Sequence, residues 1–398
     1  MKYQKPRRLQ QLSESVTLKL NARVKELQAS GADVVNLTAG EPDFAPPMEV
    51  LEATLDAVRA KKNKYTPVQG IRELCERVAR KTVRQQPGLK EKWSADHVVV
   101  SNGGKHALFN TMLALIDEGD EVVIPAPYWL SYPEMVRVAG GVPVAVETTL
   151  QDHFLLQPEV LRAALNERTR MLILNSPSNP TGAVYSEREF EALGEVLKDF
   201  PNVWIVSDEI YDRIHYGEPE FCSFLKACPE LQDRTVTVNG MSKAFALTGW
   251  RVGWSVCQKE LRQAIVALQG QSTSGINILA QEGSVAGLDL DDHYFDLSLE
   301  RYRSRRDLCL EILGKSGKLE VFPPRGAFYA FVGVGQCLRD GETAVGFAER
   351  LLEAAQVAVV PGDAFGDPRS VRISFAVGDD VLKEGCKRLI QFVEESQI

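Results

Sequence analysis

The sequence predicts an α/β protein with a large domain, in which helices flank a mostly parallel central sheet, and a smaller α+β domain. Three observations lead to this fold class. With 398 residues, of which 44% are hydrophobic and 25% charged, the chain is long enough for a large core and two domains. From residue 98 onward, short apolar runs alternate with stretches of helical spacing, as in βαβ units. After about residue 297 this alternation ends.

The predicted strands of the large domain are short runs that are apolar along most of their length, as in sheets buried on both faces. They lie at 97–101, 120–125, 142–147, 170–175, 202–207, 234–239 and 253–257. Between them, 105–117 and 186–198 have helical spacing. The second stretch begins with Ser186 and Glu189 at capping-box spacing, which predicts where that helix starts.

The smaller domain begins with a long charged helix at 299–313 and ends with an amphipathic helix. Its predicted strands are 320–324, 327–332, 357–360 and 371–375. We expect an N-terminal helix at 15–30 to join this domain. The chain is therefore divided into an N-terminal segment that joins the small domain, a large domain and a small C-terminal domain, at 1–44, 45–297 and 298–398.

Composition limits the partners and the compartment of the protein. The net charge of −8 and the pI near 5.4 argue against nucleic acid, which needs a basic face. The seven cysteines are odd in number and form no C-x-x-C pair, as in proteins of a reducing cytosol. The basic start is followed by no apolar signal region, and no run approaches the length of a membrane span. We expect a soluble cytoplasmic protein without membrane contact.

Ligands of open α/β sheets bind beyond the carboxyl ends of the strands, so strand ends are where chemistry is expected. One run ends in Gly103, Gly104 and Lys105 and opens a helix, which points main-chain N–H groups and a helix dipole at an anion. The spacing is not that of a Walker A loop, and no G-x-G-x-x-G follows a strand. Taken alone, a tight turn with a surface lysine explains these residues equally well.

Two further strand ends carry polar groups. Asn179 lies in the turn-forming segment NSPSNPTG, which fits an ordinary turn as well as a site. Asp208 follows a strand that should be buried, and a buried carboxylate is costly unless a cation or several donors meet it. The alternatives for Asp208 are a helix N-cap or a ligand that arrives as a cation.

The stretch GMSKAFALTGWRVG at 240–253 places Lys243 among small residues just after a strand, with Arg251 eight positions later. A desolvated lysine forms Schiff bases, and the small neighbours leave space for a bulky group on its amine. Arg251 offers a fork for phosphate. Together with the glycine turn and Asp208, these residues fit a ligand that has an aldehyde, a phosphate and a protonated ring nitrogen. Pyridoxal phosphate has all three.

At this point the chain resembles the class I aminotransferases of the aspartate aminotransferase type, which have the pyridoxal-phosphate fold type I. Residues 240–253 are similar to the lysine signature of that family, and the motifs from SVTLKLNA at 15–22 to VRISFA at 371–376 follow in the same order. One departure is Gly240, where relatives often have a serine that contacts the phosphate. The resemblance implies bound pyridoxal 5'-phosphate, and it implies no metal.

The resemblance also implies roles for the residues around the cofactor. Lys243 would hold it as an internal aldimine and, once freed by the substrate amine, would move the proton at the substrate Cα. Asp208 would pair with the pyridine nitrogen, while Asn179 and Tyr211 would donate to the phenolic oxygen. Trp129 would stack on the ring.

The phosphate would be bound by main-chain donors of Gly103, Gly104 and Lys105, by Arg251 and, across the interface of a homodimer, by the hydroxyl of Tyr65. Ser242 belongs to the same cofactor site. A site shared in this way makes the dimer necessary for function.

For the substrate, the resemblance implies that Arg372 clamps the α-carboxylate and that Gly40 lets the main chain approach it. Trp129 and Asn179 would contact the substrate as well. In the bacterial branch that this chain resembles, the side-chain carboxylate would meet Lys105 with the hydroxyls of Ser15 and Thr17. A single ammonium is less directional than an arginine fork, so more than one dicarboxylic acid can fit.

The expected function is therefore a ping-pong aminotransferase that uses a dicarboxylic amino acid, foremost L-aspartate, and 2-oxoglutarate. An aromatic or prephenate aminotransferase, or a lyase with the same cofactor, stays open as an alternative. A ligand-sensing module without turnover is disfavoured, because such proteins carry a DNA-binding domain for which the chain has no room before Ser15.

Overall fold

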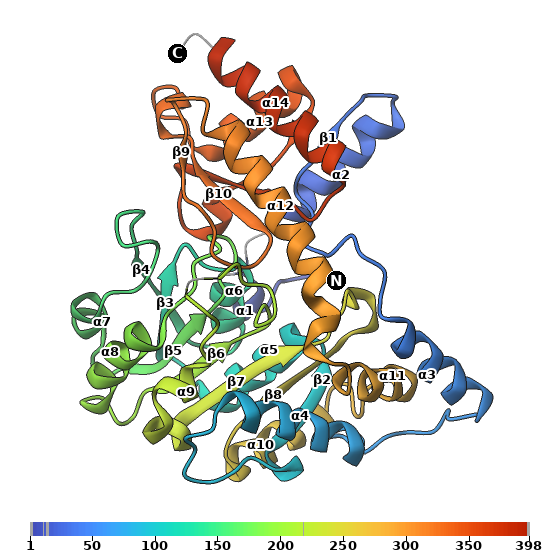
Figure 1. Cartoon of the computed structure of the whole chain (residues 1–398). Coiled ribbons are helices and arrows are strands. Elements are labelled where there is room, and N and C mark those ends of the chain that lie inside the picture. The colour runs from blue at the N-terminus through green and yellow to red at the C-terminus, as the bar shows by residue number, and fades with distance from the viewer. Residues whose placement is uncertain (1–2, 11, 13–15, 218, 396–398) are drawn as a thin grey trace.

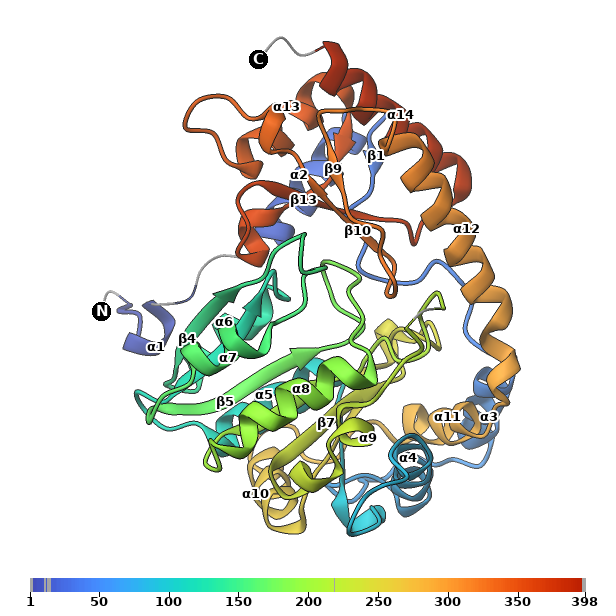
Figure 2. The ribbon, with the colours of Figure 1, turned by 60° about the vertical axis from the view of Figure 1, so that its left-hand side comes forward.

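The computed structural model describes residues 3–10, 12, 16–217 and 219–395 of the chain. Figure 1 shows two unequal parts: a large domain built around a central sheet, and a small domain to which both chain-terminal regions contribute. The helix α12 (Asp296–Leu313) runs along one side from the large domain to the small one, as Figure 2 shows. The boundaries at 44 and 297 stay predictions.

The central sheet has seven strands in the order β2-β8-β7-β6-β5-β3-β4 among the described residues. The strands β3 to β7 pair in parallel, and β8 is antiparallel to both of its neighbours. Each strand overlaps one of the seven predicted apolar runs, so the predicted fold class is confirmed. The strands are β2 (Val98–Asn102), β3 (Glu121–Ala126), β4 (Val142–Glu147), β5 (Thr169–Asn175), β6 (Trp204–Asp208), β7 (Thr235–Gly240) and β8 (Val252–Val256).

One strand differs from the expectation of burial on both faces. In β4 only Val146 is buried, and Val142 is exposed. The strand forms one edge of the sheet, but its position does not by itself explain the exposure, because β2 at the opposite edge is buried along most of its length. The other six strands are almost entirely buried along their length.

Helices cover both faces of this sheet and create a core on each side. One core joins the strands to α3, α4, α8, α9 and α11, and the other joins them to α5, α6 and α10. The capping box predicted at Ser186 is present, because its hydroxyl accepts from the Glu189 N–H while the Glu189 carboxylate accepts from the Ser186 N–H. The helices are α3 (Met48–Arg59), α4 (Arg72–Gln85), α5 (Gly104–Leu115), α6 (Ser131–Val138), α7 (Pro158–Ala164), α8 (Glu187–Lys198), α9 (Phe224–Ala227), α10 (Lys259–Gly270) and α11 (Ile278–Leu288).

The small domain contains an antiparallel sheet in the order β12-β13-β10-β9, packed with helices. The N-terminal helix packs against this domain, because Val24 lies in one apolar cluster with Leu352 and Ala358. After that helix, β1 pairs in parallel with β11. The elements are α2 (Val16–Ala29), β1 (Val35–Asn36), β9 (Glu320–Val321), β10 (Tyr329–Gly333), α13 (Ala344–Ala355), β11 (Val357–Ala358), β12 (Val360–Pro361), β13 (Ser370–Ser374) and α14 (Asp379–Glu395).

Short helical elements complete the chain. They are α1 (Arg7–Gln10) and the 3-10 helices η1 (Ala95–His97), η2 (Pro229–Arg234), η3 (Thr248–Trp250), η4 (Asp292–Phe295), η5 (Gly335–Cys337) and η6 (Gly362–Phe365). All seven cysteines are buried and unbridged. Within the described part of the chain, no helix combines the length and the apolar character needed to cross a membrane.

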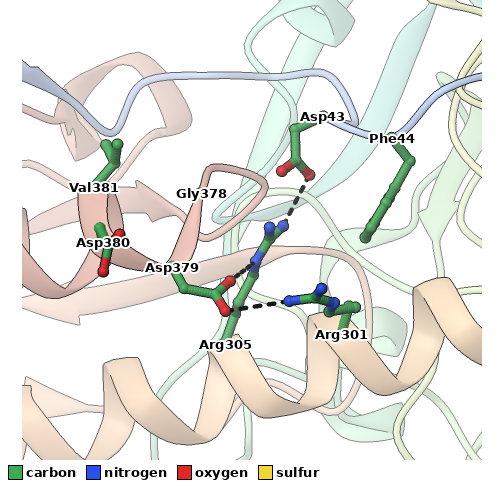
Figure 3. A pocket seen from close by; sticks show the side chains of 8 residues that line it. All are labelled: Asp43, Phe44, Arg301, Arg305, Gly378, Asp379, Asp380 and Val381. Atoms are coloured by element: carbon green, nitrogen blue, oxygen red, sulfur yellow. Dashed lines mark hydrogen bonds and ion pairs between the residues drawn. The ribbon is translucent and has the colours of Figure 1, made fainter.

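Besides α12, the segment 37–47 connects the two domains, and we call it the crossing segment. Figure 3 shows how an ion cluster ties it to the small domain. Arg305 of α12 is buried and donates to Asp43 of the crossing segment, at 2.8 Å, and to Asp379 at the start of α14, at 2.7 Å. Arg301, one turn earlier, reaches Asp379 at 3.3 Å from a more exposed position. The cluster lines an open pocket of about 510 Å³.

Candidate active site

A cavity of about 1470 Å³ lies where the carboxyl ends of the large-sheet strands face the small domain, and it collects most of the predicted site residues. Those that line it are Gly40, Gly104, Lys105, Trp129, Asn179, Asp208, Tyr211, Ser242, Lys243, Arg251 and Arg372. Gly103 adjoins the cavity through its contact with Arg251. Ser15 lies outside the described residues, and the side chain of Thr17 is not described either.

The glycine turn after β2 forms a cradle beside an arginine. Gly103 has a φ of +83° and precedes α5, whose first two residues, Gly104 and Lys105, line the cavity. The first N–H groups of a helix have no partner within the helix, so this helix start can bind an anion. A Cβ atom on Gly103 would lie 2.5 Å from a guanidinium nitrogen of Arg251. Arg251 itself donates to the carbonyls of Asn102 and Thr248. A helix start with an adjacent cation fits a phosphate group.

Gly240 lies where the main chain of a neighbouring strand approaches closely, and this explains why the residue is a glycine. An added Cβ at this position would lie 2.8 Å from the carbonyl oxygen of Val252 and 2.9 Å from the Cα of Gly253. Gly253 in turn leaves no room for a Cβ, which would lie 2.2 Å from the N atom of Gly104. The backbone as it stands therefore requires glycine at both positions.

Asp208 is a buried carboxylate at the end of β6. It accepts hydrogen bonds from the Tyr132 hydroxyl, at 2.7 Å, and from the Ile210 N–H, at 3.2 Å. It begins no helix, and among the described residues it has no ion pair. Burial raises its pKa to about 6, against the lowering effect of these hydrogen bonds. A cation that arrives with a ligand would offset the cost of this burial.

Lys243 follows β7 and its Nζ atom lies 2.5 Å from the carbonyl oxygen of Gly40 in the crossing segment. The ammonium group is also 5.8 Å from the ring centres of Tyr211 and Phe328. Burial lowers its pKa to about 8, and the charge of Arg372 adds to this effect. A substantial neutral fraction of this amine is therefore present near pH 8, as a nucleophilic lysine requires.

Arg372 of β13 is buried between the rings of Tyr329 and Phe365, whose centres are 4.3 and 5.0 Å from its guanidinium carbon. Its two terminal nitrogens donate to the side-chain oxygen of Asn179, at 2.9 Å, and to the carbonyl of Thr38, at 3.1 Å. Its Nε atom is buried and has no partner among the described residues. The Nε–H group of Arg372 is therefore a hydrogen-bond donor for which the described residues supply no acceptor.

Trp129 and Lys105 lie side by side on the cavity wall. The Lys105 ammonium is 4.9 Å from the centre of the Trp129 ring, and this ring meets Tyr132 edge to face. Tyr65 lies elsewhere: its side chain is 99% exposed and it does not line the cavity. Among the described residues no group of three or more His, Cys, Asp or Glu could hold a metal ion.

Several cavity residues were not predicted from the sequence. Tyr329 touches both Tyr211 and Arg372, Tyr132 holds Asp208, and Glu41 accepts from the Thr248 hydroxyl at 2.8 Å. Tyr329 stands in the apolar run AFYAFV, where its residue type is typical of a core strand. Tyr329 reaches the site because of its place in the sheet. Phe331 pairs with Arg372 on the neighbouring strand, and Tyr329, two residues from Phe331, lies on the same face.

The chain is similar to known proteins along nearly its whole length. A family model described as aminotransferase class I and II matches residues 32–389. The probable aspartate/prephenate aminotransferase of Rhizobium leguminosarum bv. phaseoli is 40% identical over 96% of this chain and 97% of its own. The aspartate aminotransferase of Geobacillus stearothermophilus is 40% identical over 98% of both chains. The structure of Thermus thermophilus aspartate aminotransferase with maleate is 41% identical and has a TM-score of 0.92, covering 98% of this chain and 100% of the other.

Proposed function

Because the chain belongs to the class I and II aminotransferases, we propose that it moves the amino group of L-aspartate to 2-oxoglutarate in a ping-pong reaction. The family and the aspartate aminotransferases among its relatives establish a pyridoxal-phosphate-dependent aminotransferase that acts on an amino acid and a 2-oxo acid. The predicted family, enzyme class and cofactor are confirmed to this extent. The residue roles and the choice of substrates below are proposals.

The cavity fits the cofactor at two points. The cradle of Gly103, Gly104 and Lys105 with Arg251 suits a phosphate, because it combines the N–H groups of a helix start with a cation. Asp208 is a buried carboxylate that needs a cation, and a protonated ring nitrogen is one. When bound, pyridoxal phosphate supplies an electron sink for the charge left at the substrate Cα after a proton is removed.

The chain's own groups would hold the cofactor as follows. Lys243 attaches it covalently through its amine, and Ser242 beside the lysine belongs to the same site. Asn179 and Tyr211 donate to its phenolic oxygen, and Trp129 covers a face of its ring. The Asn179 side-chain oxygen is already used by Arg372, which leaves its NH₂ group as the donor that this role requires.

Lys243 would also perform the proton transfer. The Lys243 amine would accept the proton that leaves the substrate Cα and would hold it at Nζ for its return. A general base works best when its pKa lies near the operating pH, and burial brings that of Lys243 to about 8. The Gly40 carbonyl orients the amine from the crossing segment.

Arg372 would bind the α-carboxylate of the substrate. The single observation that carries this step is its unpaired, buried Nε atom, because a buried guanidinium donor without an acceptor is costly unless a ligand supplies one. Gly40 lets the main chain approach the same carboxylate. Since the clamp belongs to the small domain and the cofactor cradle to the large one, closure of the domains over the substrate is expected.

Lys105 would bind the side-chain carboxylate, with Ser15 and Thr17. Its ammonium stands over Trp129 on the wall of the same cavity that holds Arg372. A second cation in one cavity favours a dicarboxylic substrate over alanine or phenylalanine, because each charged end then has a partner.

A second candidate substrate is prephenate. It is favoured by the names of relatives such as the aspartate/prephenate aminotransferases of Cereibacter sphaeroides and Nitrosomonas europaea, which are 41% and 39% identical to this chain. Profiling the purified yellow protein with amino donors and oxo acids, scored as separate half-reactions, decides between them. Conversion of the bound aldehyde to the amine form by aspartate supports the proposal, whereas conversion by phenylalanine or alanine but not by aspartate contradicts it.

The protein would act as a homodimer with shared sites. Tyr65 is fully exposed, and α3 nearby presents Met48, Leu55 and Val58 to solvent, which favours a covering partner. In the dimer, the Tyr65 hydroxyl would reach the phosphate in the partner's site. A mixture of inactive Lys243→Ala and Tyr65→Ala chains should regain activity, because one site of each hybrid has both residues intact. No recovery after demonstrated subunit exchange would contradict the shared site.

A further inference from the structure

Tyr329 of β10 is completely buried and touches two residues to which the proposed function gives different tasks. Its hydroxyl lies 3.0 Å from the hydroxyl of Tyr211. The face of its ring lies 4.3 Å from the guanidinium carbon of Arg372. These contacts arise from the sheet, because Phe331 is the register partner of Arg372 and Tyr329, two residues away, shares its face.

We propose that Tyr329 is a positioning residue with two separable tasks: its hydroxyl directs the proton of Tyr211 toward the cofactor, and its ring holds Arg372 in place for the substrate carboxylate. This inference rests on the proposed function of the same site. In this role Tyr329 contacts neither the phosphate nor the reacting atoms.

The first task follows from the number of hydrogen bonds that the hydroxyls of Tyr211 and Tyr329 can donate. Each hydroxyl carries one proton, so in the pair Tyr211 and Tyr329 one must donate and the other accept. If Tyr211 is to donate to the phenolic oxygen of the cofactor, Tyr329 must be the donor within the pair. A phenol that accepts one hydrogen bond donates another more strongly, so Tyr329 strengthens the bond that Tyr211 makes.

The second task follows because Arg372 is buried and, among the described residues, has no carboxylate partner. Among the described residues its guanidinium has neutral partners and two ring faces, those of Tyr329 and Phe365. A ring face attracts a cation most when water is excluded, and contact with the Tyr329 ring fixes the plane of the Arg372 guanidinium group. Removal of the Tyr329 ring should therefore weaken carboxylate binding, while removal of its hydroxyl alone should not.

Two substitutions separate the tasks. Tyr329→Phe deletes the hydroxyl and keeps the ring, whereas Tyr329→Leu deletes both. The matched control is Tyr302→Phe, because the Tyr302 hydroxyl is also buried but has no partner among the described residues and does not line the cavity. Tyr211→Phe and Arg372→Lys serve as reference variants for the two tasks.

The first readout is the pH midpoint of the visible absorption of the holoenzyme. With a weaker donor at the phenolic oxygen, the proton shared at that oxygen is held more tightly and the midpoint rises. We expect a rise of about 0.5 to 1 pH unit in Tyr329→Phe, in the same direction as in Tyr211→Phe. Tyr302→Phe should keep the wild-type midpoint. An unchanged midpoint in Tyr329→Phe, where Tyr211→Phe shifts it, overturns the first task.

The second readout is the affinity of the holoenzyme for maleate, a dicarboxylate that lacks an amine. Tyr329→Leu should bind maleate about 2- to 30-fold more weakly than wild type, and Tyr329→Phe should bind it as wild type does. If Tyr329→Leu fails to fold, Tyr329→Met replaces it, because its flexible chain fills the space without a ring. Wild-type affinity in the folded ringless variant overturns the second task.

The reference variants separate failure of this inference from failure of the proposed function. If Arg372→Lys binds maleate normally, Arg372 is not the clamp and the proposed function itself fails. If Arg372→Lys weakens binding and the ringless variant does not, the proposed function stands and the role of the Tyr329 ring is wrong.

Discussion

The Nζ atom of Lys243 lies 2.5 Å from the carbonyl oxygen of Gly40, a residue 203 positions earlier in the chain. This acceptor is neutral, and within the described part of the chain Lys243 has no ion pair, so burial and the charge of Arg372 lower its pKa to about 8 although the charges of Glu41 and Asp208 raise it. The crossing segment that carries Gly40 is itself held at Thr38 by Arg372 and at Asp43 by Arg305. The position of the amine is therefore set jointly by both domains.

The first prediction concerns the pH at which Lys243 reacts. An amine reacts when it is neutral, and burial lowers the pKa of Lys243 from 10.5 to about 8. The rate at which the apoprotein attaches pyridoxal phosphate should therefore rise up to about pH 8 and then level off. Mixing experiments followed by absorbance between pH 6.5 and 10 measure this rate.

The matched controls for that measurement are Lys243→Ala and Lys383→Ala, the second an exposed lysine on α14. Borohydride reduction and peptide mapping should label position 243 in wild type and in Lys383→Ala. Lys243→Ala should bind the cofactor without a covalent bond and lose turnover. A rate that still climbs at pH 10 would show that the lysine is not desolvated.

A second prediction concerns stability and pH. Glu209 is buried behind the site, and burial raises its pKa from 4.5 to about 7. A carboxyl whose folded pKa is raised contributes stability at low pH that is lost as the pH rises through the raised value. Between pH 5 and 8, apoprotein with Glu209→Gln should therefore lose less unfolding free energy than wild type, by at most about 3 kcal/mol. Urea unfolding at both pH values measures the difference, and equal losses would contradict it.

The third prediction tests the phosphate cradle with two glycines of similar conformation. Gly103 and Gly119 have φ values of +83° and +88°, so alanine strains both, by about 1 kcal/mol. Only at Gly103 does the added Cβ meet Arg251, while nothing lies within 4 Å at Gly119. Gly103→Ala should weaken cofactor binding to the apoprotein by on the order of tenfold or more, and Gly119→Ala should leave it unchanged. Equal affinities of the two variants would exclude the cradle.

The fourth prediction concerns substrate choice at Lys105. Loss of a charged hydrogen-bond donor costs about 1.5 to 3 kcal/mol, so Lys105→Met should lower kcat/KM for aspartate by about 10- to 150-fold. The same variant should treat alanine as wild type does, because alanine has no side-chain carboxylate. Arg137→Met is the control, since Arg137 also lines the cavity but is paired with Glu134. An equal decrease for both amino acids would remove Lys105 from the role of specificity residue.

The fifth prediction compares the two arginines of Figure 3, which lie one turn apart on α12. The Arg305 side chain is 7% exposed and holds two carboxylates, whereas that of Arg301 is 55% exposed. Arg305→Gln should lower the free energy of unfolding by about 1.5 to 3 kcal/mol, because it removes charge-assisted hydrogen bonds to Asp43 and Asp379, whose side chains are 30% and 52% exposed. Arg301→Gln should cost about 1 kcal/mol or less. Chemical denaturation of both variants checks this, and similar losses would contradict it.

The strands of the large sheet could be predicted because each is a short apolar run between turn residues, a local signal. The exposure of β4 could not, because it depends on how distant parts of the chain cover each edge of the sheet, and β2 at the other edge is buried. Lys243 and Asp208 were predicted from their positions at strand ends, and Arg372 through the resemblance to a known family. The cavity positions of Tyr132 and Tyr329 could not be predicted, since their neighbours come from distant strands and a tyrosine in an apolar run is typical of a core.

The parallel pairing of Val35 with Val357 has a consequence for synthesis on the ribosome. The first strand leaves the exit tunnel long before its partner has been translated, by roughly 15 to 65 s at about 5 to 20 residues per second. Lys243 is likewise made before Arg372 exists. Nascent chains that end before Ser370 therefore carry Lys243 without Arg372, the residue proposed to bind the substrate carboxylate.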